Sequence, residues 1–174
     1  ISLCNVENLT GKVNLRPIVF SAFEKHSTDK KNLEIYKTEA ENFSKTSSLP
    51  YKGFSGKGFV ELSKQNNTSL DFILKVHENG EYIIDFRYSN GSGPVNTDNK
   101  CCIRTLKAGN KIIGPVVMPQ KGKDEWSNWG FSNALALYLT KGENQLTLSF
   151  ESWDENMNGD VNTAMLDLIR VCEL

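Results

Sequence analysis

The segment Glu81–Gly93, EYIIDFRYSNGSG, joins a strand to a tight turn. Tyr82, Ile84, Phe86 and Tyr88 recur at every second position, so their side chains fall on one face of the strand. The rest of the segment is rich in serine, asparagine and glycine, and a proline follows it, so the strand cannot continue there. We therefore expect a rigid strand with one apolar face that ends in a polar turn.

Short alternating segments of this kind recur from Leu33 onward, separated by turns that contain Gly, Asn, Pro or Ser. Many short strands at this spacing predict an all-β protein, an antiparallel β-sandwich with no helix longer than about three turns. Asn79-Gly80 lies between two alternating runs and predicts a β-hairpin. The expected strands are Glu34–Phe43, Gly58–Leu62, Leu70–His77, Glu81–Tyr88, Cys101–Leu106, Lys111–Met118, Phe131–Leu139, Gln145–Glu151 and Met165–Val171.

Residues 1–31 differ in character from the rest of the chain. Val13–Phe20 predicts a single edge strand, because Pro17 lies within it. Glu24–Lys31 is charged and rich in turn-forming residues, as linkers are. We expect residues 1–31 to be an N-terminal extension or the tail of a neighbouring domain, and residues 32–174 to form the β-sandwich.

Composition excludes several classes of partner. The chain has 20 Lys and Arg against 21 Asp and Glu, which argues against nucleic acid or an anionic membrane held by bulk electrostatics. The apolar run Ala134–Leu139 is far shorter than the roughly 20 residues of a membrane span. No CxxC pair occurs, so zinc is not indicated. Adjacent Cys101 and Cys102 would point to opposite faces of a strand, so we expect at most one of them in the core.

Three carboxylates suggest a cation site. Glu39 and Glu41 would project from one face of the first predicted strand, and Asp167 stands among apolar residues in the last one. A half-buried carboxylate is costly unless it is paired or bound to a metal. If the first and last strands pair, the three side chains converge, and calcium is the cation that prefers such oxygen ligands. Alternatively, both glutamates face solvent and the aspartate caps a turn.

Two aromatic-rich segments suggest a ligand surface. Tyr88 and Asn90 stand where the strand gives way to the turn, and an aromatic ring beside an amide suits a polyhydroxylated ligand such as a sugar. Trp126 and Trp129 lie beside further amides in WSNWGFSN. We expect Trp126 to face the loops and Trp129 to be buried. In the alternative reading, Tyr88 and both tryptophans belong to the core and Asn90 only turns the chain.

A polar loop precedes the last predicted strand. Asp154–Asn162 begins like an EF-hand loop, but its twelfth position is Met165 and no helices flank it, so it is not an EF-hand. The loop could contact a sugar, weakly hold a cation, or simply be solvated. Its acids Asp154, Glu155 and Asp160 could also supply the two carboxylates, about 5–10 Å apart, that glycoside hydrolysis requires. Loop carboxylates lack rigid support, so we rank this enzymatic alternative below binding.

Five segments resemble successive strands of carbohydrate-binding modules of families 35 and 6, namely YKTEAENF, FSGKGFVEL, GEYIIDFRYSNGSG, LTKGENQLTLSF and AMLDLIRV. The resemblance covers about residues 33–174. Modules of these families are β-sandwiches of jelly-roll type. They are non-catalytic and are attached to glycoside hydrolases or polysaccharide lyases.

The resemblance implies a calcium ion and a sugar site. Glu39, Glu41 and Asp167 would hold a structural calcium, helped by backbone carbonyls near Gly56–Gly58. Sugar would bind where the loops meet at one edge of the sandwich. These loops carry Tyr88, Asn90, Trp126 and Trp129 and the segment before the last strand.

The chain departs from the family at one sugar contact. The family commonly has an asparagine two residues before the last-strand aspartate, where this chain has Met165, so Asn162 is the nearest amide. The resemblance therefore predicts a module, outside the cell or in the periplasm, that keeps a covalently linked enzyme near its oligosaccharide or polysaccharide. A structural sandwich that packs on a catalytic domain is the main alternative.

Overall fold

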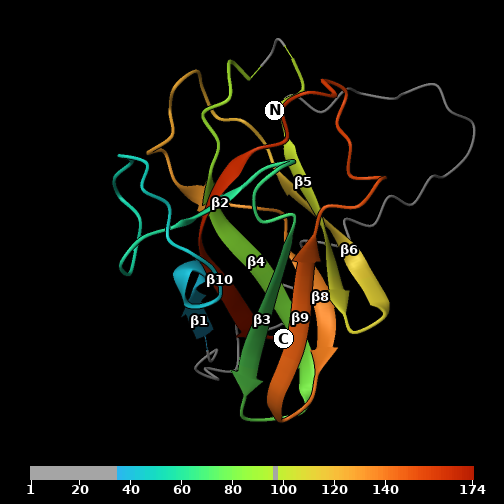
Figure 1. Cartoon of the computed structure of the whole chain (residues 1–174). Coiled ribbons are helices and arrows are strands. Elements are labelled where there is room, and N and C mark those ends of the chain that lie inside the picture. Colours follow the sequence, from blue (N-terminus) through green and yellow to red (C-terminus); the bar gives the residue numbers. More distant parts are fainter. Residues whose placement is uncertain (1–34, 96–97) are drawn as a thin grey trace, which may run out of the picture. The chain divides into compact units, whose positions relative to one another are not determined.

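The computed structural model describes residues 35–95 and 98–174, which all belong to one unit spanning Leu33–Leu174. Two sheets face each other in this unit (Figure 1). Within the described residues, the helical structure is limited to one short 3-10 helix, η1 (Ala40–Asn42). None of the described helical structure is long and apolar enough to cross a membrane. The extension predicted over residues 1–31, with its strand Val13–Phe20, lies outside the described residues.

Every strand pair in the two sheets is antiparallel, which confirms the predicted antiparallel β-sandwich of jelly-roll type. The first and last described strands pair, as the carboxylate hypothesis requires. The larger sheet has the order β1 (Ile35–Glu39), β10 (Ala164–Glu173), β4 (Gly80–Ser89) and β7 (Gly130–Phe131), with β2 (Val60–Leu62) also on β10 and β8 (Leu135–Leu139) also on β4. The smaller sheet has the order β3 (Ser69–Val76), β9 (Gly142–Ser149), β5 (Cys102–Ala108) and β6 (Lys111–Met118).

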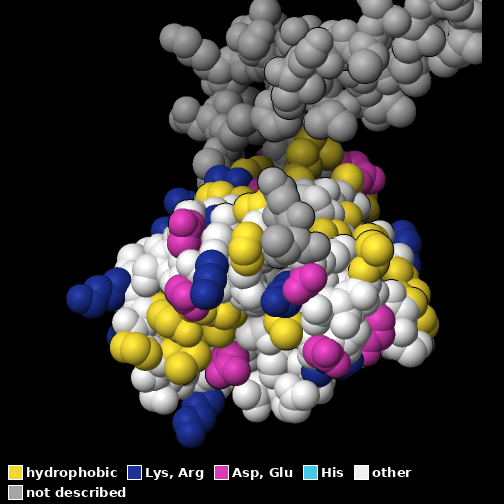
Figure 2. Space-filling model, turned by 90° about the horizontal axis from the view of Figure 1, so that it is seen from above, with side chains coloured by type: hydrophobic (Ala, Val, Ile, Leu, Met, Phe, Trp, Pro, Cys, Tyr) yellow, Lys and Arg dark blue, Asp and Glu magenta, His cyan; other side chains and the backbone are white. Residues whose placement is uncertain are grey.

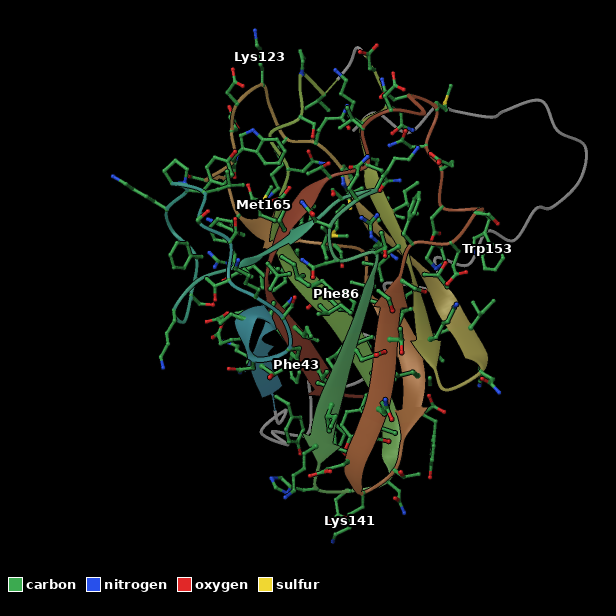
Figure 3. All side chains as sticks on the ribbon, in the orientation of Figure 1. Phe43, Phe86, Lys123, Lys141, Trp153 and Met165 are labelled. Carbon is green, nitrogen blue, oxygen red and sulfur yellow. The ribbon has the colours of Figure 1, made fainter. Side chains whose placement is uncertain are left out.

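The core lies between the two sheets and contains the apolar face predicted for β4. Tyr82, Ile84 and Phe86 are completely buried, and Tyr88 is 3% exposed. Phe86, which is labelled in Figure 3, lies in the interior of the sandwich. It meets Phe72 of β3 edge to face, with ring centroids 6.1 Å apart, so the two sheets touch directly here. Full burial of one such side chain contributes about 1.5–3 kcal/mol, which explains why the alternating pattern of β4 fixes its orientation.

The first predicted strand is shorter than expected. It ends at Glu39, and the chain then turns into η1, where Ala40 is buried in the core and accepts a hydrogen bond from the Phe43 backbone N–H (3.0 Å). The prediction that Glu39 and Glu41 share one strand face is therefore wrong. A small residue that packs inward bends the backbone between them.

Two further predictions need correction. The turn at Asn79-Gly80 makes no hairpin, because β3 and β4 lie in different sheets and the turn carries the chain from one to the other. The predicted strand over residues 131–139 is also interrupted, forming β7 and β8. The prediction that at most one cysteine lines the core is confirmed: Cys102 belongs to the core between the sheets, while Cys101 is buried outside it, under the loop before β10, where Asn156 Nδ2 donates to its carbonyl (2.6 Å).

Candidate functional site

The turn after β4 and the loop that carries the two tryptophans lie against each other at one end of the sandwich. Backbone N–H groups of Lys121 and Asp124 donate to the carbonyls of Asn90 and Gly91, each at 2.9 Å. A Cβ at Gly91 would lie 2.8 Å from ring atoms and the backbone nitrogen of Trp126, so only glycine allows this approach. The structure thus brings together the two segments that the sequence singled out as a ligand surface.

Tyr88 and Asn90 are nevertheless buried at this end. Tyr88 donates its hydroxyl to the Pro119 carbonyl (3.0 Å), and burial raises its pKa to about 12. Asn90 is fully buried; its Nδ2 donates to two carbonyls, of Lys100 (3.1 Å) and Met118 (3.0 Å). Its Oδ1 accepts from a backbone N–H of the turn itself (3.0 Å). Direct sugar contact does not fit this placement, and both side chains instead hold the loops together.

Asn162 has a similar position beside β5. It is 1% exposed, and its Oδ1 accepts from the Ile103 backbone N–H (2.9 Å) and from the guanidinium of buried Arg104 (2.7 Å). Its Nδ2 donates to the Asp154 carbonyl (2.8 Å). The predicted sugar contact through Asn162 therefore does not fit either, because its amide is used inside the protein.

Several aromatic side chains at this end are partly accessible to solvent. Trp126 is half-buried, and its ring stacks on that of Tyr51 with centroids 5.6 Å apart and planes at 13°. Tyr51 stacks in turn on buried Phe59 at 5.9 Å. Trp129 is also half-buried, packs on Phe59 at 5.6 Å, and donates its indole N–H to the Lys52 carbonyl (2.6 Å). The expected division into one exposed and one buried tryptophan is not seen. We call Tyr51, Phe54, Phe59, Trp126 and Trp129 the loop aromatic cluster.

Sequence reasoning missed Tyr51 and Phe54. Both rings are half-buried, and Phe54 packs on Phe59 at 5.4 Å. A signal was present in YKGFSGKGF, where aromatic residues stand among glycines and lysines in a segment without strand alternation. Figure 2 looks onto the loop end and shows hydrophobic side chains gathered in a patch among charged ones.

The three predicted metal ligands approach one short loop. Asp167 is fully buried at a bulge of β10, and its Oδ1 accepts from the Ser55 backbone N–H (2.8 Å). The Ser55 hydroxyl lies between this oxygen (3.1 Å) and Oε2 of Glu39 (2.8 Å). Glu41 accepts the Lys57 backbone N–H on Oε1 (2.7 Å), while its buried Oε2 has no hydrogen-bond partner. We call Glu39, Glu41 and Asp167 the acidic cluster.

The acidic cluster fits a hard cation in part. Its ligands are oxygens, which calcium prefers, and one buried oxygen lacks a partner. A positive φ of 59° at Gly56 lets the backbone pass so close that a Cβ would lie 2.4 Å from Oε1 of Glu41. In the described part of the chain, however, no three acidic, histidine or cysteine side chains are arranged to hold a metal ion by themselves. Calcium binding stays a prediction.

Arg87 joins the acidic cluster to the loop aromatic cluster. Its guanidinium forms an ion pair with Asp167, donates to the Gly53 carbonyl (3.1 Å), and lies over the ring of Trp129 at 5.6 Å. The backbone N–H of Lys52 donates to the hydroxyl of Ser127 (2.9 Å) on the tryptophan loop. Residues 51–57 are thus held by both clusters at once.

The loop before β10 holds Asp154 inside the protein, whereas Glu155 and Asp160 are exposed. Asp154 is 1% exposed, and its carboxylate accepts from the Thr105 hydroxyl (3.0 Å) and from the Glu151 backbone N–H (2.9 Å). Glu155 is paired with Lys64 at 2.7 Å, and Asp160 is exposed. Asp154 is therefore poorly placed to act as the acid or base of glycoside hydrolysis.

Comparisons with known proteins extend this picture. No family model matches the sequence. A cycloisomaltooligosaccharide glucanotransferase of Niallia circulans is 28% identical over 137 residues, which are 78% of this chain but only 13% of that protein. A family 35 carbohydrate-binding module of Cellvibrio japonicus superimposes with a TM-score of 0.56 and 17% identity, over 79% of this chain and 92% of that one. A Paenibacillus cycloisomaltooligosaccharide glucanotransferase complexed with cycloisomaltoheptaose gives a TM-score of 0.58 and 24% identity, over 77% of this chain and 18% of that one.

Proposed function

We propose that this domain, which has the fold of a family 35 carbohydrate-binding module, binds α-1,6-linked gluco-oligosaccharides without cleaving them. The predicted resemblance to that family is confirmed at the level of the fold. The observation that carries the proposal is the loop aromatic cluster, where Trp126 and Tyr51 are half-buried and stacked at 5.6 Å. Rigid aromatic rings with an accessible surface suit the apolar face of a pyranose, and exposed Ser127 and Asn128 beside them can bond its hydroxyls.

The choice of sugar rests on the sequence relative. That protein is named for its action on cycloisomaltooligosaccharides, in which glucose units are joined by α-1,6 bonds. The chain spans 13% of this relative, so we propose that it works as one module of a longer carbohydrate-active enzyme, outside the cell or in the periplasm. A linked module raises the local concentration of the enzyme at its polymer without adding a chemical step.

We also propose that the acidic cluster holds a structural calcium ion. Glu39, Glu41 and Asp167 would supply carboxylate oxygens, and the partnerless Oε2 of Glu41 is the group that gains most from a cation. Carbonyls of the neighbouring residues 56–58 would complete the shell. Such an ion would fix the loop 51–57 that positions Tyr51 in the loop aromatic cluster.

Affinity electrophoresis tests the ligand class. The unmodified protein is run through gels that contain dextran, an α-1,6-glucan, and through gels with a β-1,4-mannan or no polysaccharide. We expect retardation in dextran alone, and loss of it in Trp126→Ala. Met157→Ala is the matched control, because that side chain is 90% exposed and lies outside the loop aromatic cluster. Equal mobility in all three gels would count against glucan binding and favour a domain that only packs on an enzyme.

A further inference from the structure

We propose a second carbohydrate-binding surface, centred on Trp153 and extending over the outer face of the smaller sheet. It shares no residue with the loop aromatic cluster and takes its ligand class, a neutral α-glucan, from the proposed function. Trp153 is 60% exposed, whereas the other two tryptophans are half-buried. Figure 3 shows Trp153 projecting from the flank of the sandwich, well away from Lys123 at the loop end.

A buried polar network fixes the orientation of the Trp153 ring. Its indole N–H donates to the hydroxyl of Thr105 (3.0 Å), which is 2% exposed on β5. That hydroxyl donates in turn to the carboxylate of Asp154 (3.0 Å), and Asp154 also accepts from the Glu151 backbone N–H (2.9 Å). The only polar atom of the indole is thus satisfied inside the protein, while most of the side chain stays in contact with water.

This arrangement differs from an ordinary exposed side chain. Single exposed hydrophobic residues are common on protein surfaces and need no special explanation. Here the ring is tethered at one edge to a hydroxyl that is itself held by a buried carboxylate, so the ring is ordered before any ligand arrives. A preordered aromatic face binds with a smaller loss of side-chain freedom than a mobile one does.

Polar side chains continue from Trp153 across the smaller sheet. Lys107 on β5 stands opposite Thr147 on β9, which stands opposite Asp71 on β3. The Thr147 hydroxyl donates to Asp71 (2.6 Å), and Lys107 forms an ion pair with Glu151. Neighbouring strands lie about 4.8 Å apart, so this row offers hydrogen-bonding groups over roughly the length of two sugar rings.

The charges of this row favour a neutral ligand. Lys107 is paired with Glu151, and Ser149 donates its hydroxyl to the same glutamate (2.6 Å). The cation is therefore already compensated and does not call for an anionic sugar. A glucan chain would stack one ring on Trp153 and lay the next units over hydroxyls and carboxylates of β5, β9 and β3.

Two sites on one module predict a difference between polymer and short oligosaccharide. A long chain can engage both surfaces, and its affinity then exceeds that of either site alone by avidity. We expect Trp153→Ala to weaken binding to dextran at least tenfold, while binding of isomaltotriose at the loop aromatic cluster is unchanged. Met157→Ala, which removes another exposed side chain of the same loop, should change neither.

The direct test follows the indole N–H signals of the three tryptophans by nitrogen-15 NMR while isomaltotriose is added to the unmodified protein. Trp153→Phe and Trp126→Phe assign the signals. We expect the Trp153 signal to shift in a saturable manner, and to do so equally in Trp126→Ala. A Trp153 signal that stays fixed while that of Trp126 moves would overturn the second site alone. A Trp153 signal that moves while that of Trp126 stays fixed would support it and contradict the loop aromatic cluster; two fixed signals would overturn both.

Discussion

Gly91 is the residue at which the two loops of the sandwich end approach most closely. A methyl group there would meet the ring and backbone nitrogen of Trp126 at 2.8 Å, and backbone atoms cannot yield as a flexible side chain can. We predict that Gly91→Ala lowers the free energy of unfolding by about 1–3 kcal/mol, the usual range for overpacking. Denaturant titration gives this value.

Gly80→Ala is the matched control for Gly91→Ala. At Gly80 the nearest atom to a new Cβ is the Tyr82 ring at 3.7 Å, an ordinary contact. The free energy of unfolding of the Gly80→Ala variant should stay close to that of the unmodified protein. Equal effects of the two substitutions would show that the loops do not depend on this close approach.

Arg87 is the residue that compensates the buried charge of Asp167. Asp167 is fully buried and Arg87 is 25% exposed, so removing the guanidinium leaves a carboxylate without its ion-pair partner inside the protein. We predict that Arg87→Ala costs about 3 kcal/mol of stability. The double variant Arg87→Ala, Asp167→Asn should lose less free energy of unfolding than the two single variants lose together. Strict additivity in this cycle would contradict the coupling.

The residue scale also shows where sequence reasoning reaches its limit. Alternation placed Tyr88 on the same face as Phe86, which is the buried face, yet we predicted Tyr88 as a sugar contact because a polar turn follows it. For Asn90, the sequence pattern of a turn is the same whether the side-chain amide faces solvent or bonds to buried backbone groups. Its burial depends on the Met118 carbonyl and on a loop about 30 residues away in the chain, and a local pattern does not contain that information.

At the scale of elements, loop 51–57 connects the two candidate sites. It touches the acidic cluster at Ser55 and the tryptophan loop at Lys52. A cation bound by the acidic cluster would therefore order the aromatic side as well. We predict that calcium at a hundredfold excess over its dissociation constant stabilises the protein by about 2.7 kcal/mol. Thermal melts with calcium and with EDTA measure this difference.

Variants localise the calcium effect. Glu41→Gln removes the negative charge of the carboxylate to which the partnerless oxygen belongs, and it should abolish the difference between the two melts. Glu173→Gln, at the far end of β10, is the control, and its melting temperatures in calcium and in EDTA should still differ. A melting temperature of the unmodified protein that is the same in calcium and EDTA would contradict the calcium proposal.

The elements themselves were largely predictable from alternation and turn residues, because a strand with one buried face must alternate. The errors share one cause: a strand's pairing partners lie far away in the sequence, so a local pattern does not identify them. Asn79-Gly80 has the composition of a hairpin turn, yet the strands on either side of it do not pair with each other. β3 pairs with β9, and β4 pairs with β10, β7 and β8. Strand β1 ends earlier than predicted because Ala40 packs into a core whose other residues lie far away in the sequence.

At the scale of the whole molecule, the proposed function makes the sandwich a module that holds a glucan and leaves it intact. We predict no release of reducing ends from dextran by the protein, because Asp154 is buried and bonded and Glu155 is ion-paired. A reducing-sugar assay over hours at high protein concentration tests this. Cleavage that disappears in Asp154→Asn or Glu155→Gln would revive the enzymatic alternative.

The most direct test of the central claim is calorimetry with a linear isomalto-oligosaccharide on the unmodified protein and on Trp126→Ala. We predict saturable binding to the unmodified protein. In the variant, loss of the aromatic anchor should cost about 2 kcal/mol, or roughly a thirtyfold weaker affinity, while the melting temperature stays within a few degrees because the ring is only half-buried. A folded variant that binds the oligosaccharide as tightly as the parent, or a parent that does not bind it at all, would contradict sugar binding by the loop aromatic cluster.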